Sequence, residues 1–97
     1  MFMTIDELLK KAREIWGDDK LSIDEVLIRQ GVTIGDLHRY ARDKAEGMPV
    51  DEKELKKELG NVIFSTIRWC DDLGFSPSEC IELGILSQQR YQERKNN

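Results

Sequence analysis

Residues 57–74, KELGNVIFSTIRWCDDLG, form an otherwise apolar helical segment that carries a few polar side chains able to bind a ligand or take part in catalysis. At 100° per residue, the apolar side chains cover two sides of this helix and leave a narrow polar stripe between them. The stripe consists of Glu58, Asn61, Ser65 and Arg68. Glu58 and Asn61 are three residues apart, so they project from the same side and can share a hard cation such as magnesium. The stripe can equally face solvent, with Glu58 paired with Lys57 or Lys53, and spacing alone does not decide between these interpretations.

The elements that position this stripe are predicted to be helices, because apolar residues recur with a helical period and no strand-like alternation occurs. The pattern predicts four helices, over residues 5–16, 23–45, 51–73 and 77–91, with a fraying polar tail at 93–97. Thr4, Ser22 and Ser76 each stand three residues before a glutamate, which is the capping-box spacing of a helix start. Gly31 lies inside the second helix and weakens it, so a break at this residue stays open.

The fold class expected from this pattern is all-α: a single domain over residues 1–97, built as a four-helix bundle with an antiparallel central pair. Ninety-seven residues with 39% hydrophobic content are enough for one core and too few for a second. The third helix is apolar on two sides, which predicts that neighbours enclose it. We therefore expect the chain to assemble as a homodimer or homotetramer.

Charge and composition exclude several classes of protein. The net charge of −4 argues against a sequence-independent grip on nucleic acid. No apolar run approaches the ~18 residues that a membrane span needs, and the N-terminus lacks a signal-peptide pattern, so we expect a cytoplasmic protein. Cys70 and Cys80 lie in apolar helical pattern without a nearby histidine, which predicts reduced thiols near the core.

Residues 54–64, ELKKELGNVIF, followed by 68–74, RWCDDLG, and a short turn into a last helix, resemble the MazG-like all-α NTP pyrophosphohydrolases. The resemblance covers roughly residues 25–91. Proteins of this family hold magnesium with an E-E-x-x-E motif on one helix and an E-x-x-D motif on the next. They convert a nucleoside triphosphate to the monophosphate and pyrophosphate, and they commonly build this site within dimers or tetramers.

The resemblance also implies site residues in this chain. When residues 35–37, GDL, are matched to the end of the first motif, its acidic positions fall on Val32, Thr33 and Asp36, and the second motif falls on Glu58 and Asn61. The implied magnesium or manganese carboxylates are Asp36 and Glu58, with Glu58 as the catalytic residue. Thr33 and Asn61 are neutral oxygen ligands in place of acids, and Arg90 is a contact for substrate phosphate.

Pyrophosphohydrolysis needs metal to neutralise charge on phosphate and a carboxylate to activate water. The loss of three acids from the implied set weakens metal binding and removes a candidate base. Magnesium usually keeps several waters and few protein ligands, so an ion held mainly by a triphosphate can still bind here. We therefore interpret the chain as a diverged family member in which nucleotide binding is better supported than fast turnover. The nucleotide, and whether another subunit supplies the missing acids, stay open.

Two other functions compete with this interpretation. Residues 23–42 also look like a helix-turn-helix, with Gly31 in the turn, residues 33–42 as the recognition helix, and Arg39, Arg42 and Lys44 facing DNA phosphates. A helix broken at Gly31 would favour this DNA-binding regulator, and a continuous helix would favour the pyrophosphohydrolase-like arrangement. The third alternative is a non-catalytic protein that uses the fold only to associate.

Overall fold

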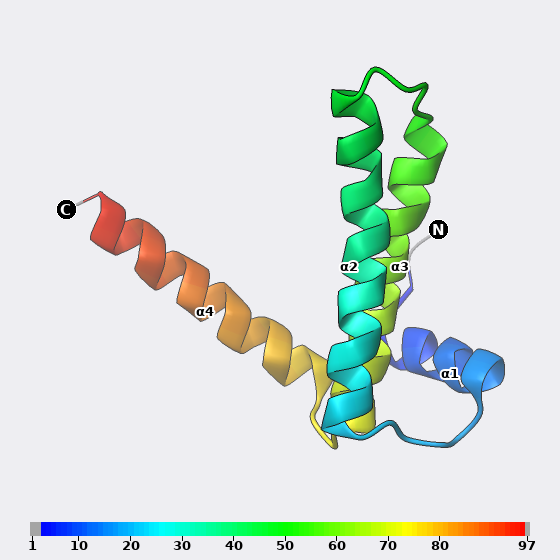
Figure 1. Ribbon diagram of the computed structural model, residues 1–97. Helices are drawn as coiled ribbons and strands as arrows, with labels where there is room; N and C mark the ends of the chain where they lie inside the picture. The colour runs from blue at the N-terminus through cyan, green and yellow to red at the C-terminus, as the bar shows by residue number, and fades with distance from the viewer. Residues whose placement is uncertain (1–2, 97) are drawn as a thin grey trace.

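The protein consists of four α-helices in a computed structural model that describes residues 3–96 (Figure 1). The helices are α1 (Ile5–Trp16), α2 (Ile23–Ala45), α3 (Glu52–Asp72) and α4 (Pro77–Lys95). No strand occurs within residues 3–96, so the all-α prediction is confirmed there; residues 1, 2 and 97 of the expected domain lie outside the described residues. No helix in this part of the chain is long and apolar enough to cross a membrane.

Side-chain caps start the helices where the sequence predicts them. The Thr4 and Ser22 hydroxyls accept hydrogen bonds from the backbone N–H of Glu7 and Glu25, and both glutamates accept bonds in return. The bond from the Ser22 backbone lowers the pKa of Glu25 below its ordinary value. At the other end of the chain α4 continues through Lys95, beyond the predicted start of fraying. Its last turn carries Arg94 and Lys95, and their positive charges are stabilised by the negative C-terminal end of the helix dipole.

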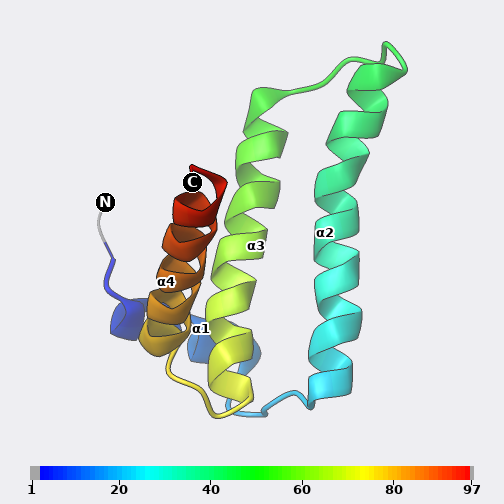
Figure 2. The same cartoon turned by 90° about the vertical axis from the view of Figure 1, so that its left-hand side faces the viewer.

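The antiparallel pair α2 and α3 forms the long axis of the molecule, as the views in Figures 1 and 2 both show. The α2 helix is continuous from Ile23 to Ala45 and passes through Gly31 without a break. Gly47, at a positive φ of 77°, follows its last turn and lets the chain reverse toward α3. Because α2 has no turn at Gly31, the two separate helices that a helix-turn-helix requires are not present in residues 23–45.

The core lies at one end of the hairpin, where α1 packs across α3 (Figure 1). The buried apolar side chains among the described residues are Ala12, Val26, Ile67 and Trp69. They come from three different helices, so this small cluster is what joins α1 to the α2–α3 pair. Beside it the Trp16 ring stacks on Phe64, with ring centroids 5.3 Å apart.

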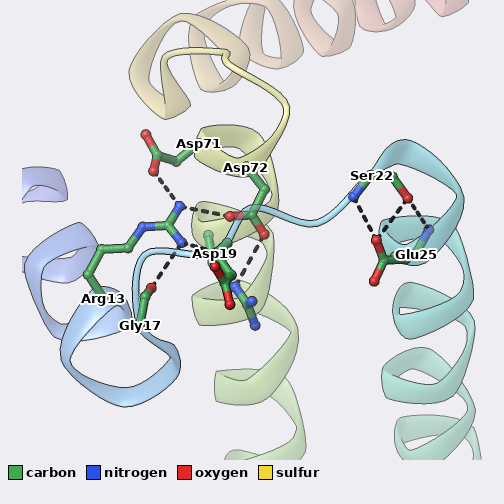
Figure 3. Close-up of polar contacts among 8 residues, drawn as sticks. Arg13, Gly17, Asp19, Ser22, Glu25, Asp71 and Asp72 are labelled. Carbon is green, nitrogen blue, oxygen red and sulfur yellow. Dashed lines mark hydrogen bonds and ion pairs between the residues drawn. The ribbon is translucent and has the colours of Figure 1, made fainter.

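Charged groups complete this end of the molecule (Figure 3). Arg13 of α1 donates hydrogen bonds to Asp71 and Asp72 at the end of α3, at 2.5 and 2.7 Å. The bond to Asp71, followed by that to Asp72, raises the pKa of Arg13 above its ordinary value. Arg68 adds a second cation, with its Nε 3.2 Å from Asp72 and its guanidinium 4.6 Å from the centroid of the Trp16 ring. Arg68 of the predicted polar stripe is therefore buried, and it interacts with Asp72 at the end of α3 and with Trp16 of α1.

The α4 helix extends away from the other three (Figure 1). It packs on α3 near its start, where Pro77 is buried and Cys80 is half-buried, and every described residue from Ile81 onward is exposed. Cys70 of α3 and Cys80 of α4 are both free thiols, as predicted. Neighbours therefore enclose α3 only around its second half, while Leu59 and Ile63 in its first half stay exposed within one chain.

Cys70, at the junction of α3 and α4, is expected to react slowly with alkylating reagents. Burial, together with a hydrogen bond to the Cys80 thiol, raises the pKa of Cys70 to about 11. Because only the thiolate reacts, we expect iodoacetamide at pH 8 to alkylate Cys70 about 100-fold more slowly in the folded chain than in urea. Peptide mass spectrometry over a time course measures this rate, and equal rates in buffer and in urea would contradict the buried position of the thiol.

Candidate functional site

A pocket lies between the C-terminal half of α2 and the N-terminal half of α3, and it brings together two of the predicted site residues. Asp36 of α2 and Glu58 of α3 both line it, and its volume is about 160 Å³. Pro49 and Val50, from the connection between the helices, line its outer end. The two carboxylates are 22 positions apart in the sequence, and the antiparallel pairing of the helices places them on a common cavity.

The pocket is lined by more acidic residues than the two predicted from the sequence. Its lining includes the carboxylates of Asp36, Asp43, Asp51, Glu54 and Glu58. The additional acids follow a helical spacing that points to them: Asp43 stands seven residues after Asp36, and Glu54 stands four residues before Glu58. Residues seven or four apart lie on one helix face, so this spacing was the signal available in the sequence. The Asp51 carboxylate already caps α3, because it accepts a hydrogen bond from the Lys53 backbone at 3.0 Å.

Three cations moderate this negative charge, and one of them, Arg42, lies outside the lining with its Nη2 3.6 Å from Asp43. Arg39 lines the pocket and donates a hydrogen bond of 2.8 Å to Asp36. Lys57 lies beside it, with its Nζ 2.7 Å from Glu54 and 3.7 Å from Glu58. The hydrogen bond to Glu54, and then the charges of Glu54 and Glu58, raise the pKa of Lys57 above its ordinary value. The cations therefore border the carboxylates and do not neutralise all of them.

Among the carboxylates that line the pocket, Glu58 has a buried oxygen without a hydrogen-bond partner. Its side chain is 16% exposed, and its Oε1 faces Lys57. Its Oε2 is buried and has no hydrogen-bond partner within residues 3–96. A buried carboxylate oxygen without a donor is unfavourable by about 1–3 kcal/mol. Glu58 therefore has one oxygen that a cation or a donor from a ligand can satisfy.

The pocket does not by itself form a complete metal site. Among the described residues, no group of three or more acidic, histidine or cysteine side chains converges closely enough to hold a metal ion. Asp36 and Glu58 offer the oxygen donors that magnesium prefers, and magnesium commonly takes only one or two protein carboxylates. An ion here would need its other ligands from water and from the phosphate oxygens of a bound molecule.

The other predicted site residues do not line this pocket. The Thr33 hydroxyl donates a hydrogen bond of 3.0 Å to the backbone carbonyl of Arg29, which uses its only proton inside the helix. Asn61 is exposed. Arg90 is exposed on α4, which diverges from the hairpin in Figure 1, and it is not part of the pocket lining.

Comparisons of the chain with protein-family models, with curated proteins and with solved structures found no match.

Proposed function

We propose that this chain is a diverged MazG-like protein that binds a nucleoside triphosphate together with magnesium at the Asp36–Glu58 pocket, and hydrolyses it slowly or not at all. The observation that carries the proposal is the buried, unpartnered Oε2 of Glu58 in a pocket that also contains Asp36. The continuous α2 helix supports the proposal, because a pair of unbroken antiparallel helices is the arrangement in which these two carboxylates line the same pocket.

The charge of the pocket favours a metal-bound nucleotide over a free one. Five carboxylates line it, with Arg39 in the lining and Lys57 and Arg42 beside it, so the local balance is negative. A bare triphosphate would be repelled by this field, whereas a divalent cation is attracted by it and neutralises part of the triphosphate charge. Arg39 and Lys57 supply donors for phosphate oxygens at the border of the pocket. The cytoplasm is the proposed location.

The bound metal would supply charge neutralisation on the phosphate and acidify a coordinated water. In this chain, Asp36 and Glu58 would hold it, and Glu58 would also be the nearest candidate to accept a proton. A single carboxylate that both binds metal and accepts a proton is a poor base, because the cation stabilises its ionised form. The small carboxylate set therefore supports binding more strongly than turnover.

The test begins with binding. With magnesium and a nonhydrolysable triphosphate analogue at 100 times its Kd, we expect the free energy of unfolding to rise by about 2.7 kcal/mol. Glu58→Gln should abolish this stabilisation and leave the unliganded protein at least as stable, because the amide removes repulsion from Glu54. Glu52→Gln is the matched control: it lies on the same helix outside the pocket, its side chain is 81% exposed, and it should respond to ligand like the wild type.

Catalysis is measured on the same three proteins as pyrophosphate release from a panel of ribo- and deoxyribonucleoside triphosphates, with magnesium or manganese. Turnover that Glu58→Gln abolishes and Glu52→Gln retains would make the protein a pyrophosphohydrolase. Binding without turnover is the other outcome that agrees with the proposal. If no triphosphate changes the thermal unfolding of the wild type in the presence of either metal, the proposal is wrong.

A further inference from the structure

A single copy of this chain exposes far more surface than a compact protein of its mass. Its accessible surface is 7694 Å², whereas a folded monomer of 11.3 kDa exposes about 5,700 Å². Its radius of gyration is 16.0 Å, against about 12.5 Å for a compact chain of this length. The excess of about 2,000 Å² is more than twice the ~800 Å² that each partner buries in a standard interface, and it lies in the range of obligate homodimers.

Part of this excess is an apolar stripe on α3. Leu59, Ile63, Thr66 and Cys70 recur at intervals of four, three and four residues, which places them on one face of the helix. Cys70 is half-buried against Cys80, so this face is the side on which α4 begins. Farther along, Leu59 and Ile63 are 44% and 64% exposed. The Thr66 hydroxyl donates a hydrogen bond of 2.6 Å to the Val62 carbonyl. Its proton is therefore already bonded and needs no acceptor from a molecule that covers the stripe.

The rest of the excess includes α4 itself. Large apolar side chains stay exposed around this helix at Ile81, Leu83, Ile85, Leu86 and Tyr91. Residues 83–89 carry no charge, and neither do residues 59–67 of α3. Interface cores are depleted of charged residues, so these two uncharged segments are matched in chemical character. One chain thus carries both an exposed apolar stripe on α3 and a projecting α4 whose uncharged segment has exposed apolar side chains.

The junction between α3 and α4 keeps these two surfaces apart within one chain. The N–H of Gly74 donates to Asp71 and that of Phe75 to Cys70, while the Ser76 hydroxyl caps α4. Gly74 has a φ of 80°, which sets the direction in which α4 leaves. With this junction α4 leaves α3 after its first turns, and its apolar side chains stay exposed within one chain.

We propose that the chain forms a symmetric homodimer in which α4 of each copy packs along the Leu59–Ile63 stripe on α3 of the other copy. One twofold axis makes this contact twice, so the stripe on α3 of each copy and one face of each α4 are covered by the same partner. The inference rests on the surface of the chain and is separate from nucleotide binding.

The first measurement is the mass in solution by size-exclusion chromatography with light scattering, without nucleotide or metal. We expect twice the 11.3 kDa mass of the chain. Ile63→Glu on α3 and Ile85→Glu on α4 should each give a monomer, because a charge buried in an apolar contact is strongly unfavourable. Gln30→Glu, which adds the same charge at an exposed position of α2 outside residues 59–67 and 83–89, is the matched control and should remain dimeric. Both apolar side chains are exposed in the single chain, and circular dichroism checks that the variants keep their helices.

A crosslinking experiment identifies the contact in a dimer that has not been disrupted. In a background with Cys70→Ser and Cys80→Ser, a chain carrying Ile63→Cys is mixed with a chain of different tag length carrying Ile85→Cys, and a short bismaleimide is added. We expect the mixed dimer to crosslink much faster than either chain alone. A monomeric wild-type protein would overturn the proposal, as would a dimer that tolerates both glutamate substitutions or crosslinks only between identical chains.

Discussion

Asp72→Asn is expected to lower the free energy of unfolding by about 3 kcal/mol, through the loss of one buried charge. The Asp72 side chain has no exposed surface and stands between two cations, Arg13 of α1 and Arg68 of α3. The amide keeps the shape of the side chain and removes its charge, which leaves Arg68 buried without a counter-ion. A domain of this size has a total stability of about 5–15 kcal/mol, so this single change removes a large share of it.

Asp71→Asn is the matched control for this substitution. Asp71 is the neighbouring aspartate, it bonds the same guanidinium, and its side chain is 32% exposed. Water can replace much of its interaction, so we expect a loss of less than about 1 kcal/mol. Urea denaturation followed by circular dichroism, at one fixed protein concentration, compares the two variants. Equal losses for both aspartates would show that the buried charge of Asp72 is not what stabilises this end of the protein.

Trp69→Ala is expected to destabilise the chain by about 3–5 kcal/mol, the usual range for removing a large buried aromatic side chain. Trp69 is only 5% exposed and is the largest of the few buried apolar residues within residues 3–96. Because the core is so small, few buried side chains lie near Trp69 that could move into the cavity left by the substitution. We expect the thermal transition of this variant to broaden as well as to shift to lower temperature, since packing between α1 and α3 loosens.

Phe75→Ala provides the comparison for an aromatic side chain outside the core. Phe75 is 59% exposed, and its structural contribution to the junction comes from its backbone N–H, which the substitution leaves in place. We expect it to lower the free energy of unfolding by less than about 1 kcal/mol. The same denaturation curves measure it, and a loss as large as that of Trp69→Ala would mean that burial within one chain does not determine the stability.

Local signals in the sequence predicted the helices well, because a helix start depends on residues within one turn of it. Thr4 with Glu7 and Ser22 with Glu25 form the predicted capping boxes, and glycines follow the ends of the first three helices. The continuity of α2 through Gly31 was not predictable in the same way. A glycine inside a helix is unfavourable by about 1 kcal/mol, and whether the helix continues depends on its packing against a neighbouring helix.

The polar stripe on α3 divides into residues with different roles, which its spacing did not reveal. Glu58 lines a pocket, Asn61 is exposed, and Arg68 is buried in an ion-pair network with α1. These residues occupy one face of one helix, so periodicity treats them alike. Their separation comes from what lies opposite each of them: α2 and its acids at one end, and α1 with Trp16 at the other.

By itself, the sequence determined the helical class of the fold and the positions at which the helices begin. Both depend on short-range hydrogen bonding and on helical periodicity. Only the tertiary structure decided that Asp36 and Glu58 share a pocket, that Asp72 is buried between two arginines, and that α4 leaves the other helices with its apolar side chains exposed. These features join residues far apart in the chain, and they depend on the direction in which each helix leaves its turn, which no local pattern of residue types encodes.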